Sequence, residues 1–133
     1  MNTYNLLISH SWKYSDAYDR LVALLKNRGY FNFRNYSVPR IDPIIDAVGD
    51  VALEQAIEAQ MRPCHVVLFL AGVYATHSKW IGKEIEMAKR FKKPILGINP
   101  WGAVNTSTLV QDNADRMVNW NADSIVAAIR DLA

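Results

Sequence analysis

Glu84 is the residue whose placement in this sequence best indicates a chemical role. The residues from Lys79 to Lys93 predict a helix. At about 100° per residue, its buried stripe consists of Ile81, Ile85 and Ala88, which lie within roughly 40° of one another. Glu84 lies roughly 60° from Ile81, inside an apolar arc that three large side chains extend: Trp80, Met87 and Phe91. The opposite, polar face carries Lys83, Glu86 and Arg90.

Two interpretations of Glu84 follow from this placement. Burying an unpaired carboxylate is costly, so such a residue is expected to have either a partner or a chemical task. In the structural interpretation, Glu84 pairs with a buried arginine or accepts hydrogen bonds from loop amides. In the chemical interpretation, its carboxylate takes part in a reaction. Trp80, four residues earlier on the same face, lies near the N-terminal end of the helix.

The elements around this helix alternate between strand and helix. Short apolar segments predict five strands, at Tyr4–Ile8, Tyr30–Phe33, Val66–Leu70, Pro94–Ile98 and, less regularly, Arg116–Val118. Helical spacing and capping residues predict helices after Ser15, over Asp50–Met61, after Ser78 and after Asn121. Long loops are expected from Asn35 to Gly49 and from Asn99 to Asp115.

This alternation predicts an α/β fold in which helices cover both faces of a parallel sheet. The expected architecture is a flavodoxin-like three-layer sandwich with five parallel strands in the order 2-1-3-4-5. That order places a topological switch point between strands 1 and 3, where a crevice opens at their carboxyl ends. The loops Ser9–Tyr14 and Ala71–Lys79 border it.

Several residues in or beside these loops are candidates to contact a ligand. They are His10, Ser11, Trp12, Tyr36, Ser78 and Trp80. The aromatic rings could stack on a flat base, although such side chains often serve ordinary packing. His10 could hydrogen-bond a substrate or be a loop histidine with a structural partner. The loop from Asn35 to Gly49 is long enough to expect that it borders the crevice and carries Tyr36 towards it.

Length and composition indicate how the chain is organised and where it is expected to act. The chain of 133 residues has no internal repeat or linker, so residues 1–133 are expected to form one domain. The single Cys64, the lack of a secretion signal and the lack of a long apolar run predict a cytoplasmic protein that does not cross a membrane.

No metal site or nucleic-acid surface is expected. The three histidines are scattered without ligand spacing. The basic residues of the helix at Lys79–Lys93, within a net charge of +2, indicate a solvated face. Glycine patterns that bind phosphates are absent.

The sequence resembles the bacterial TIR-like domain family, including the Thoeris antiphage defence branch. The spacing of Trp80 and Glu84 is the W-x-x-x-E pattern of the corresponding TIR helix, within HSKWIGKEIEMAK at His77–Lys89. Further similar segments are SHSW at Ser9–Trp12, NYSVP at Asn35–Pro39 and KPILGINPWG at Lys93–Gly102. The resemblance spans essentially the whole chain and supports the flavodoxin-like, TIR-like fold.

The resemblance implies an enzyme that cleaves NAD at the nicotinamide ribosyl bond. Glu84 is then catalytic, nicotinamide is released, and the product is a nucleotide derived from ADP-ribose, often a signal. NAD is the substrate and no cofactor is implied. TIR enzymes commonly complete their sites by association, so self-association or an effector is expected to activate the protein. The long loop after strand 4 departs from many TIR domains, which affects the expected product.

Two other functions remain open from the sequence. One is a non-catalytic TIR-like module that signals by self-association. The other is a different nucleoside-processing enzyme, such as a deoxyribosyltransferase, which uses a related α/β fold and a catalytic glutamate.

Overall fold

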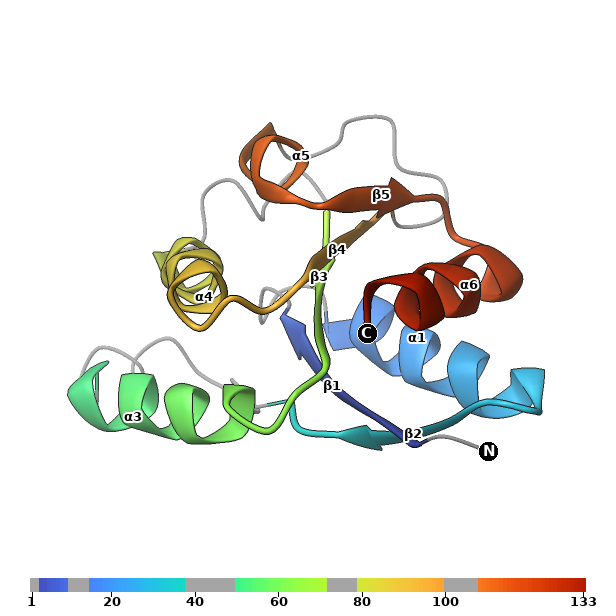
Figure 1. The fold of residues 1–133 in the computed structure, drawn as a ribbon, viewed down its shortest axis with the longest axis horizontal. Coiled ribbons are helices and arrows are strands. Elements are labelled where there is room, and N and C mark those ends of the chain that lie inside the picture. The colour runs from blue at the N-terminus through green and yellow to red at the C-terminus, as the bar shows by residue number, and fades with distance from the viewer. Residues whose placement is uncertain (1–2, 10–14, 38–49, 72–78, 100–107) are drawn as a thin grey trace.

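The computed structural model describes residues 3–9, 15–37, 50–71, 79–99 and 108–133. The strands are β1 (Thr3–Ser9), β2 (Asn32–Asn35), β3 (Val66–Leu70), β4 (Ile95–Ile98) and β5 (Arg116–Val118). The helices are α1 (Ser15–Arg28), α3 (Asp50–Met61), α4 (Lys79–Arg90), α5 (Thr108–Asn113) and α6 (Ala122–Leu132). The described strands form one parallel sheet in the order β2-β1-β3-β4-β5, which confirms the predicted topology (Figure 1).

Helices cover both faces of this sheet, as the predicted three-layer sandwich requires (Figure 1). On one face, α1 and α6 pack against side chains of β1, β3 and β4 that include Ile8, Leu68 and Leu96. On the other face, α3, α4 and α5 pack against the alternate side chains, which include Leu7 and Phe69. We call the second layer the α4 face. Side chains alternate along a strand, so successive residues of β1 point alternately to the two layers.

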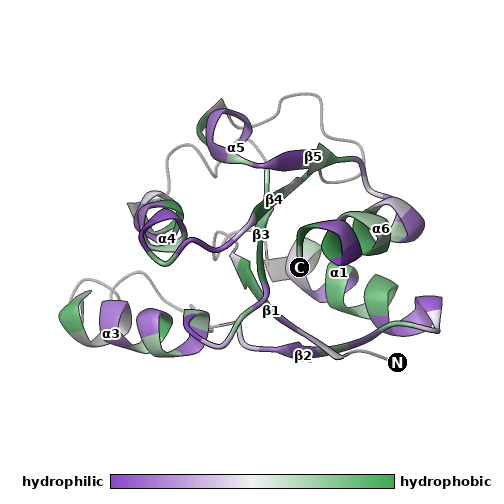
Figure 2. Cartoon of the chain, viewed as in Figure 1, coloured by the Kyte–Doolittle hydropathy of each residue, from purple (hydrophilic) through white to green (hydrophobic). Residues whose placement is uncertain are grey.

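The central strand explains why the sheet is stable in this arrangement. All five residues of β3 are buried, and Figure 2 shows the strand as hydrophobic along its length. A parallel strand covered on both faces is expected to be continuously apolar rather than alternating. The strands β1 and β4 flank β3, so Phe69 of β3 has Ser9 of β1 on one side and Gly97 of β4 on the other.

Several predicted boundaries were wrong, and backbone conformation explains two of the errors. The first strand runs over Thr3–Ser9 rather than Tyr4–Ile8. The second strand begins at Asn32 rather than Tyr30, because Gly29 and Tyr30 both have positive φ angles, 78° and 55°, and form the turn after α1. The helix α4 ends at Arg90 rather than near Lys93, and Lys92 has a φ of 57°. The predicted loop from Asn99 to Asp115 contains the short helix α5.

The helix α6 begins as predicted. Asn121 has an extended backbone, and its side chain accepts a hydrogen bond from the Ser124 N–H, which is the expected arrangement for an N-cap. Among the described residues, no helix is long and apolar enough to cross a membrane.

Candidate functional site

Glu84 is fully buried, which confirms its predicted placement in the apolar arc of α4. Its side chain is 0 % exposed, and the neighbouring Ile81 and Ile85 are 0 % and 3 % exposed. Glu86, two residues later, is exposed. Apolar residues of the α4 face therefore surround a carboxylate that most helices would present to water.

The outer side of α4 holds the helix in this orientation. Lys83 Nζ lies 3.3 Å from Glu54 Oε2, so an ion pair joins α4 to α3 away from the sheet. Ile81, Ile85 and Ala88 contribute to the apolar cluster between α4 and the sheet. The amphipathic pattern thus fixes which side chains point inward, and Glu84 is one of them.

Ser9 is the second buried polar residue of the described segments. Its side chain is 0 % exposed, as is that of Glu84, and these two are the only buried polar or charged residues in that part of the chain. Ser9 is the last residue of β1 and pairs with Phe69 of β3. The strands β1 and β3 are neighbours in the sheet, but the chain after β1 continues to α1 on one face and the chain after β3 continues to α4 on the other. In open α/β sheets, ligands bind at the carboxyl ends of such a pair of strands.

The register places Ser9 on the α4 face. Leu7 and Phe69 both belong to the apolar cluster of that face. Ser9 lies two residues after Leu7 and opposite Phe69, so its side chain points in the same direction as theirs. Ser9 and Glu84 consequently lie in the same layer of the protein.

A further property of Ser9 concerns the hydrogen bonding of its hydroxyl group. Within the residues that the structure describes, Ser9 Oγ is buried and has no hydrogen-bond partner. Ser37 offers a contrast, because its Oγ accepts the Ile8 N–H at 2.9 Å. Ser37 therefore has a structural partner in β1, whereas Ser9 has none in the described segments.

Tyr36 lies on the same face of the sheet as Glu84. The Tyr36 N–H donates to Leu6 O at 2.8 Å, so the chain continues alongside β1 beyond the end of β2. The Tyr36 ring is partly buried against the apolar cluster of the α4 face. Its predicted contact with a substrate remains a prediction.

The other candidates lie largely outside the described residues. This applies to His10, Ser11, Trp12 and Ser78, and to most of the loop that follows Tyr36. Trp80 lies in the first turn of α4, but its side chain is outside the described part of the structure. The predicted crevice between the loops Ser9–Tyr14 and Ala71–Lys79 remains a prediction.

Ser9 was not among the candidate residues that the sequence suggested. We predicted that the first strand ends at Ile8, which assigned Ser9 to the following loop. Extending the alternation from Leu7 by two residues would have placed a hydroxyl in the same layer as Glu84.

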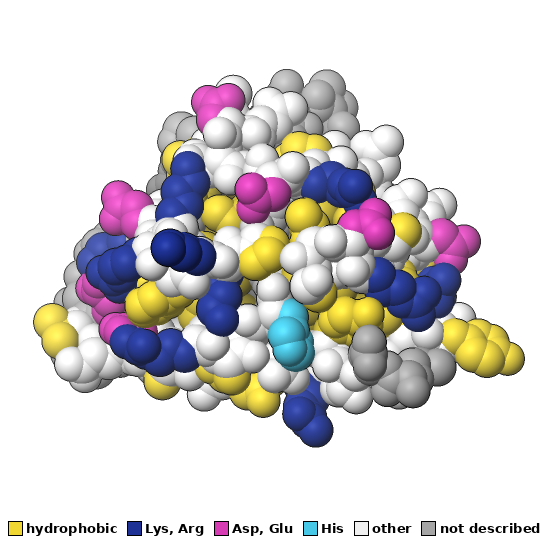
Figure 3. Space-filling view, viewed as in Figure 1, with side chains coloured by type: hydrophobic (Ala, Val, Ile, Leu, Met, Phe, Trp, Pro, Cys, Tyr) yellow, Lys and Arg dark blue, Asp and Glu magenta, His cyan; other side chains and the backbone are white. Residues whose placement is uncertain are grey.

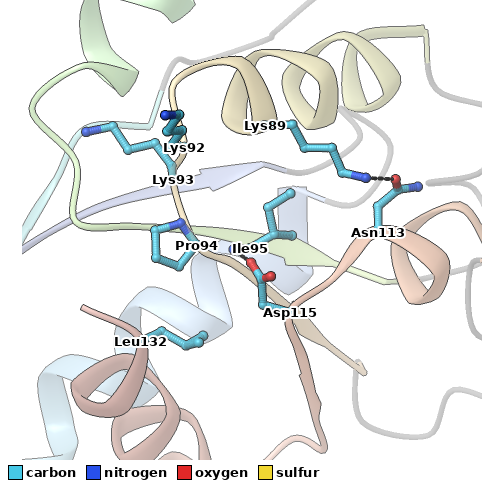
Figure 4. Close-up of a pocket in the computed structure, with 8 residues that line it drawn as sticks. All are labelled: Lys89, Lys92, Lys93, Pro94, Ile95, Asn113, Asp115 and Leu132. Carbon is cyan, nitrogen blue, oxygen red and sulfur yellow. Dashed lines mark hydrogen bonds between the residues drawn. The ribbon is translucent and has the colours of Figure 1, made fainter.

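A hollow of about 460 Å³ lies at another place, beyond the C-terminal end of α4 (Figure 4). Lysine and arginine side chains gather over this part of the surface in Figure 3. The hollow is lined by Lys89, Lys92, Lys93, Pro94, Ile95, Asn113, Asp115 and Leu132, and so does not include Glu84. Figure 4 shows Asp115 inside it, where Oδ2 accepts the Ile95 N–H at 2.7 Å.

Two of the three lysines that line this hollow have structural roles. Lys93 Nζ donates to Arg62 O at 2.7 Å, just after the end of α3. Lys89 Nζ donates to Asn113 Oδ1 at the end of α5. Helix C-terminal ends carry partial negative charge, which ammonium groups offset. These contacts favour helix stabilisation over the binding of an anion.

Cys64 is not a candidate nucleophile. Burial raises the pKa of its thiol to about 12, although nearby Lys93 lowers it. Its Sγ donates to Gln60 O at 3.2 Å. A buried thiol of this kind behaves as a small hydrophobic residue. Among the described residues, no group of three His, Cys, Asp or Glu side chains could hold a metal ion.

Two solved structures have a similar fold. The CMP N-glycosidase BcmB of Clostridium botulinum superposes with a TM-score of 0.56 and 11% identity, over 95% of this chain and 98% of that one. A 2-deoxyribosyltransferase from Bacillus psychrosaccharolyticus gives a TM-score of 0.56 and 10% identity, over 94% of this chain and 95% of that one. At these identities the similarity establishes the α/β fold alone.

The family comparison is more specific. No curated protein has a sequence that matches this chain significantly. The family model "Thoeris protein ThsB, TIR-like domain" matches residues 7–105, which include the end of β1 with Ser9 and the whole of α4 with Glu84. Because this match covers well over half of the chain, the protein belongs to the Thoeris ThsB TIR-like domain family.

Proposed function

We propose that this protein cleaves NAD between nicotinamide and ribose, with Glu84 as the catalytic carboxylate, and that it acts in Thoeris antiphage defence. The observation that carries the proposal is the complete burial of Glu84 on the apolar side of α4. Membership of the ThsB TIR-like family supports the defence context.

The reaction suits a site with one carboxylate. Hydrolysis of an ordinary glycoside usually uses two carboxyl groups, because the leaving alcohol must be protonated. Nicotinamide leaves from a cationic ring and departs as a neutral molecule, so no general acid is needed. The protein must then stabilise positive charge on the ribosyl group as the bond breaks, and the Glu84 carboxylate supplies this stabilisation.

The surroundings of Glu84 strengthen this effect. The side chains next to it on α4 are apolar and buried, including Ile81 and Ile85. A charge acts more strongly in such a layer than in water because the effective dielectric constant is lower. Tyr36, which packs on the same face, is a candidate to contact the nicotinamide or the sugar, as are His10, Ser11, Trp12, Ser78 and Trp80.

The product is proposed to be a nucleotide derived from ADP-ribose that acts as a signal. The ribosyl group freed from nicotinamide can be transferred to water or to another group of the same molecule. NAD is thus the substrate, and the proposed reaction needs no cofactor.

A second candidate is cleavage of the base–sugar bond in another nucleoside or nucleotide. The fold similarity to the CMP N-glycosidase and the 2-deoxyribosyltransferase, each at a TM-score of 0.56, favours this alternative over a reaction at some other bond. Glu84 would perform the same electrostatic task there. The third possibility is a TIR-like module that associates with itself and does no chemistry.

One assay separates these functions. The purified protein is incubated with NAD and, in parallel, with CMP and deoxynucleosides, and the released base is measured by chromatography. Release of nicotinamide that disappears in Glu84→Gln supports the proposal. Release of cytosine or another base from the alternative substrates alone contradicts the choice of NAD, and no release from any of them favours the non-catalytic module.

A further inference from the structure

Ser9 carries a buried hydroxyl at a position of β1 where an apolar side chain would pack equally well. Its side chain is 0 % exposed, and Oγ has no hydrogen-bond partner within the described residues. The three preceding residues of the strand are Leu6, Leu7 and Ile8, all buried. A buried polar group without a partner destabilises a fold, so a role in stability does not explain this serine.

Its place in the sheet suggests a different role. Ser9 ends β1, which is bonded to β3 on one side and β2 on the other. The strand order reverses between β1 and β3. In doubly wound folds, the carboxyl ends of the two strands at such a reversal border the ligand site. The side chain of Ser9 points to the α4 face, the layer that also contains Glu84.

We propose that Ser9 binds substrate: its hydroxyl forms a hydrogen bond with a hydroxyl group of the ribosyl ring that Glu84 acts on. This inference rests on the proposed function and adds a specific substrate contact to it. The observation that carries it is that Ser9 and Glu84 are the two buried polar side chains of the described segments and share one layer.

The chemistry of the two groups is complementary. A serine hydroxyl both donates and accepts, as a sugar hydroxyl does, so the two form a neutral hydrogen bond in either direction. The carboxylate then has to stabilise only the developing charge at the sugar carbon that loses the base. No covalent bond to Ser9 forms or breaks, and the serine acts by holding the ring in orientation.

The first test compares three variants of the protein. Ser9→Ala removes the hydroxyl and is expected to lower kcat/KM for NAD about tenfold, with an unchanged or higher melting temperature. Ser9→Thr keeps a hydroxyl and is expected to recover part of the loss. Ser37→Ala is the matched control, because the Ser37 hydroxyl bonds Ile8 N. It is expected to lower the melting temperature and to leave kcat/KM within about twofold.

The second test identifies the partner of the hydroxyl. NAD analogues that lack the 2′- or the 3′-hydroxyl of the nicotinamide ribose are compared in wild type and Ser9→Ala. If Ser9 binds one of these groups, removal of both partners costs no more than removal of either one, so the two losses are not additive. Additive losses with both analogues overturn the inference.

The outcomes keep this inference separate from the proposed function. Wild-type protein that releases no nicotinamide, or a Glu84→Gln variant that keeps full activity, overturns the proposed function and this inference with it. Loss of activity in Glu84→Gln but not in Ser9→Ala overturns the role of Ser9 alone. Ser9→Ala protein that melts earlier at unchanged kcat/KM assigns the serine to packing and also overturns it.

Discussion

Replacement of Glu84 by glutamine tests the central assignment, because it removes the charge and keeps the shape. The amide has nearly the volume of the carboxyl group and can still accept a hydrogen bond. Packing against Ile81 and the rest of the apolar cluster should therefore survive. The property that is lost is the negative charge that the proposed reaction needs.

The expected magnitude follows from the burial of Glu84, whose side chain is 0 % exposed. A unit charge about 4 Å from a developing cation contributes about 4 kcal/mol at an effective dielectric constant of about 20. Part of this energy is already present in the bound, cationic substrate, so the loss from the transition state is expected to be about 3 kcal/mol. That corresponds to at least a hundredfold decrease in nicotinamide release.

The assay combines turnover with thermal unfolding. We expect Glu84→Gln to melt at the same temperature as wild type or slightly higher, because a buried charge that serves catalysis carries a desolvation cost. Glu86→Gln, on the exposed side of the same helix, is the control and should change neither property. If the carboxylate instead belongs to a structural ion pair, its loss costs about 3–5 kcal/mol of stability. A variant that melts much earlier and keeps its turnover would refute our assignment.

The other predictions concern Cys64, Gly97 and the dependence of turnover on protein concentration. Cys64 should resist alkylation by iodoacetamide at pH 8 in the folded protein and react after denaturation, because its folded pKa is about 12; rapid labelling of native protein would contradict this. The protonated thiol is favoured by the fold, so its contribution to stability is present below pH 9.0 and is lost as the pH rises towards about 12, which unfolding measured across that range should detect. Gly97→Val should lower the free energy of unfolding by about 1–3 kcal/mol, since even a Cβ at this position lies 2.2 Å from Met117 Sδ and 3.0 Å from Val110 Cγ1; Gly82→Ala, with open space around it, is the control for denaturant unfolding. Turnover per molecule should rise with protein concentration if association activates the enzyme, and strict proportionality in a protein shown to be monomeric would argue against it.

The parts of the fold that were predictable share strong local patterns. The apolar strand β3 and the helix α3 have the predicted bounds, Val66–Leu70 and Asp50–Met61. The strand order follows from the strict alternation of strand and helix, which leaves few topologies for a parallel sheet. The burial of Glu84 was predictable because α4 is strongly amphipathic and the residue lies inside its apolar arc.

The errors occurred where the local signal is weak. The helix α5 has six residues and a single buried side chain, Val110, so no helical period could be recognised within its loop. The start of β2 was placed two residues early because Tyr30 is aromatic and looks like a strand residue. In the structure it is 84 % exposed and adopts a left-handed conformation directly after Gly29.

The candidate site was harder to predict than the fold because its proposed residues come from distant segments. Pattern analysis identified Glu84 from one helix, but Ser9 gains its meaning from pairing with Phe69, sixty residues away in the chain. Such a pairing follows from the register of two strands, which a single sequence does not specify. The candidates at residues 10–12 and at Ser78 lie outside the described residues and stay predictions.

The complete burial of Glu84 links the proposed chemistry to its regulation. At 0 % exposure the carboxylate cannot meet a substrate, so catalysis requires a form of the protein in which a path to Glu84 is open. If that form is a minor state of the isolated chain, the apparent affinity for NAD falls in proportion to its population. A second copy or an effector that binds the open form better shifts the population towards it, and the shift is limited by the difference in affinity for the two forms. A closed resting state would keep the cellular NAD intact until an activating partner is present. If Glu84 is the catalytic group, its burial would allow one small domain to be both stable at rest and active when a partner is present.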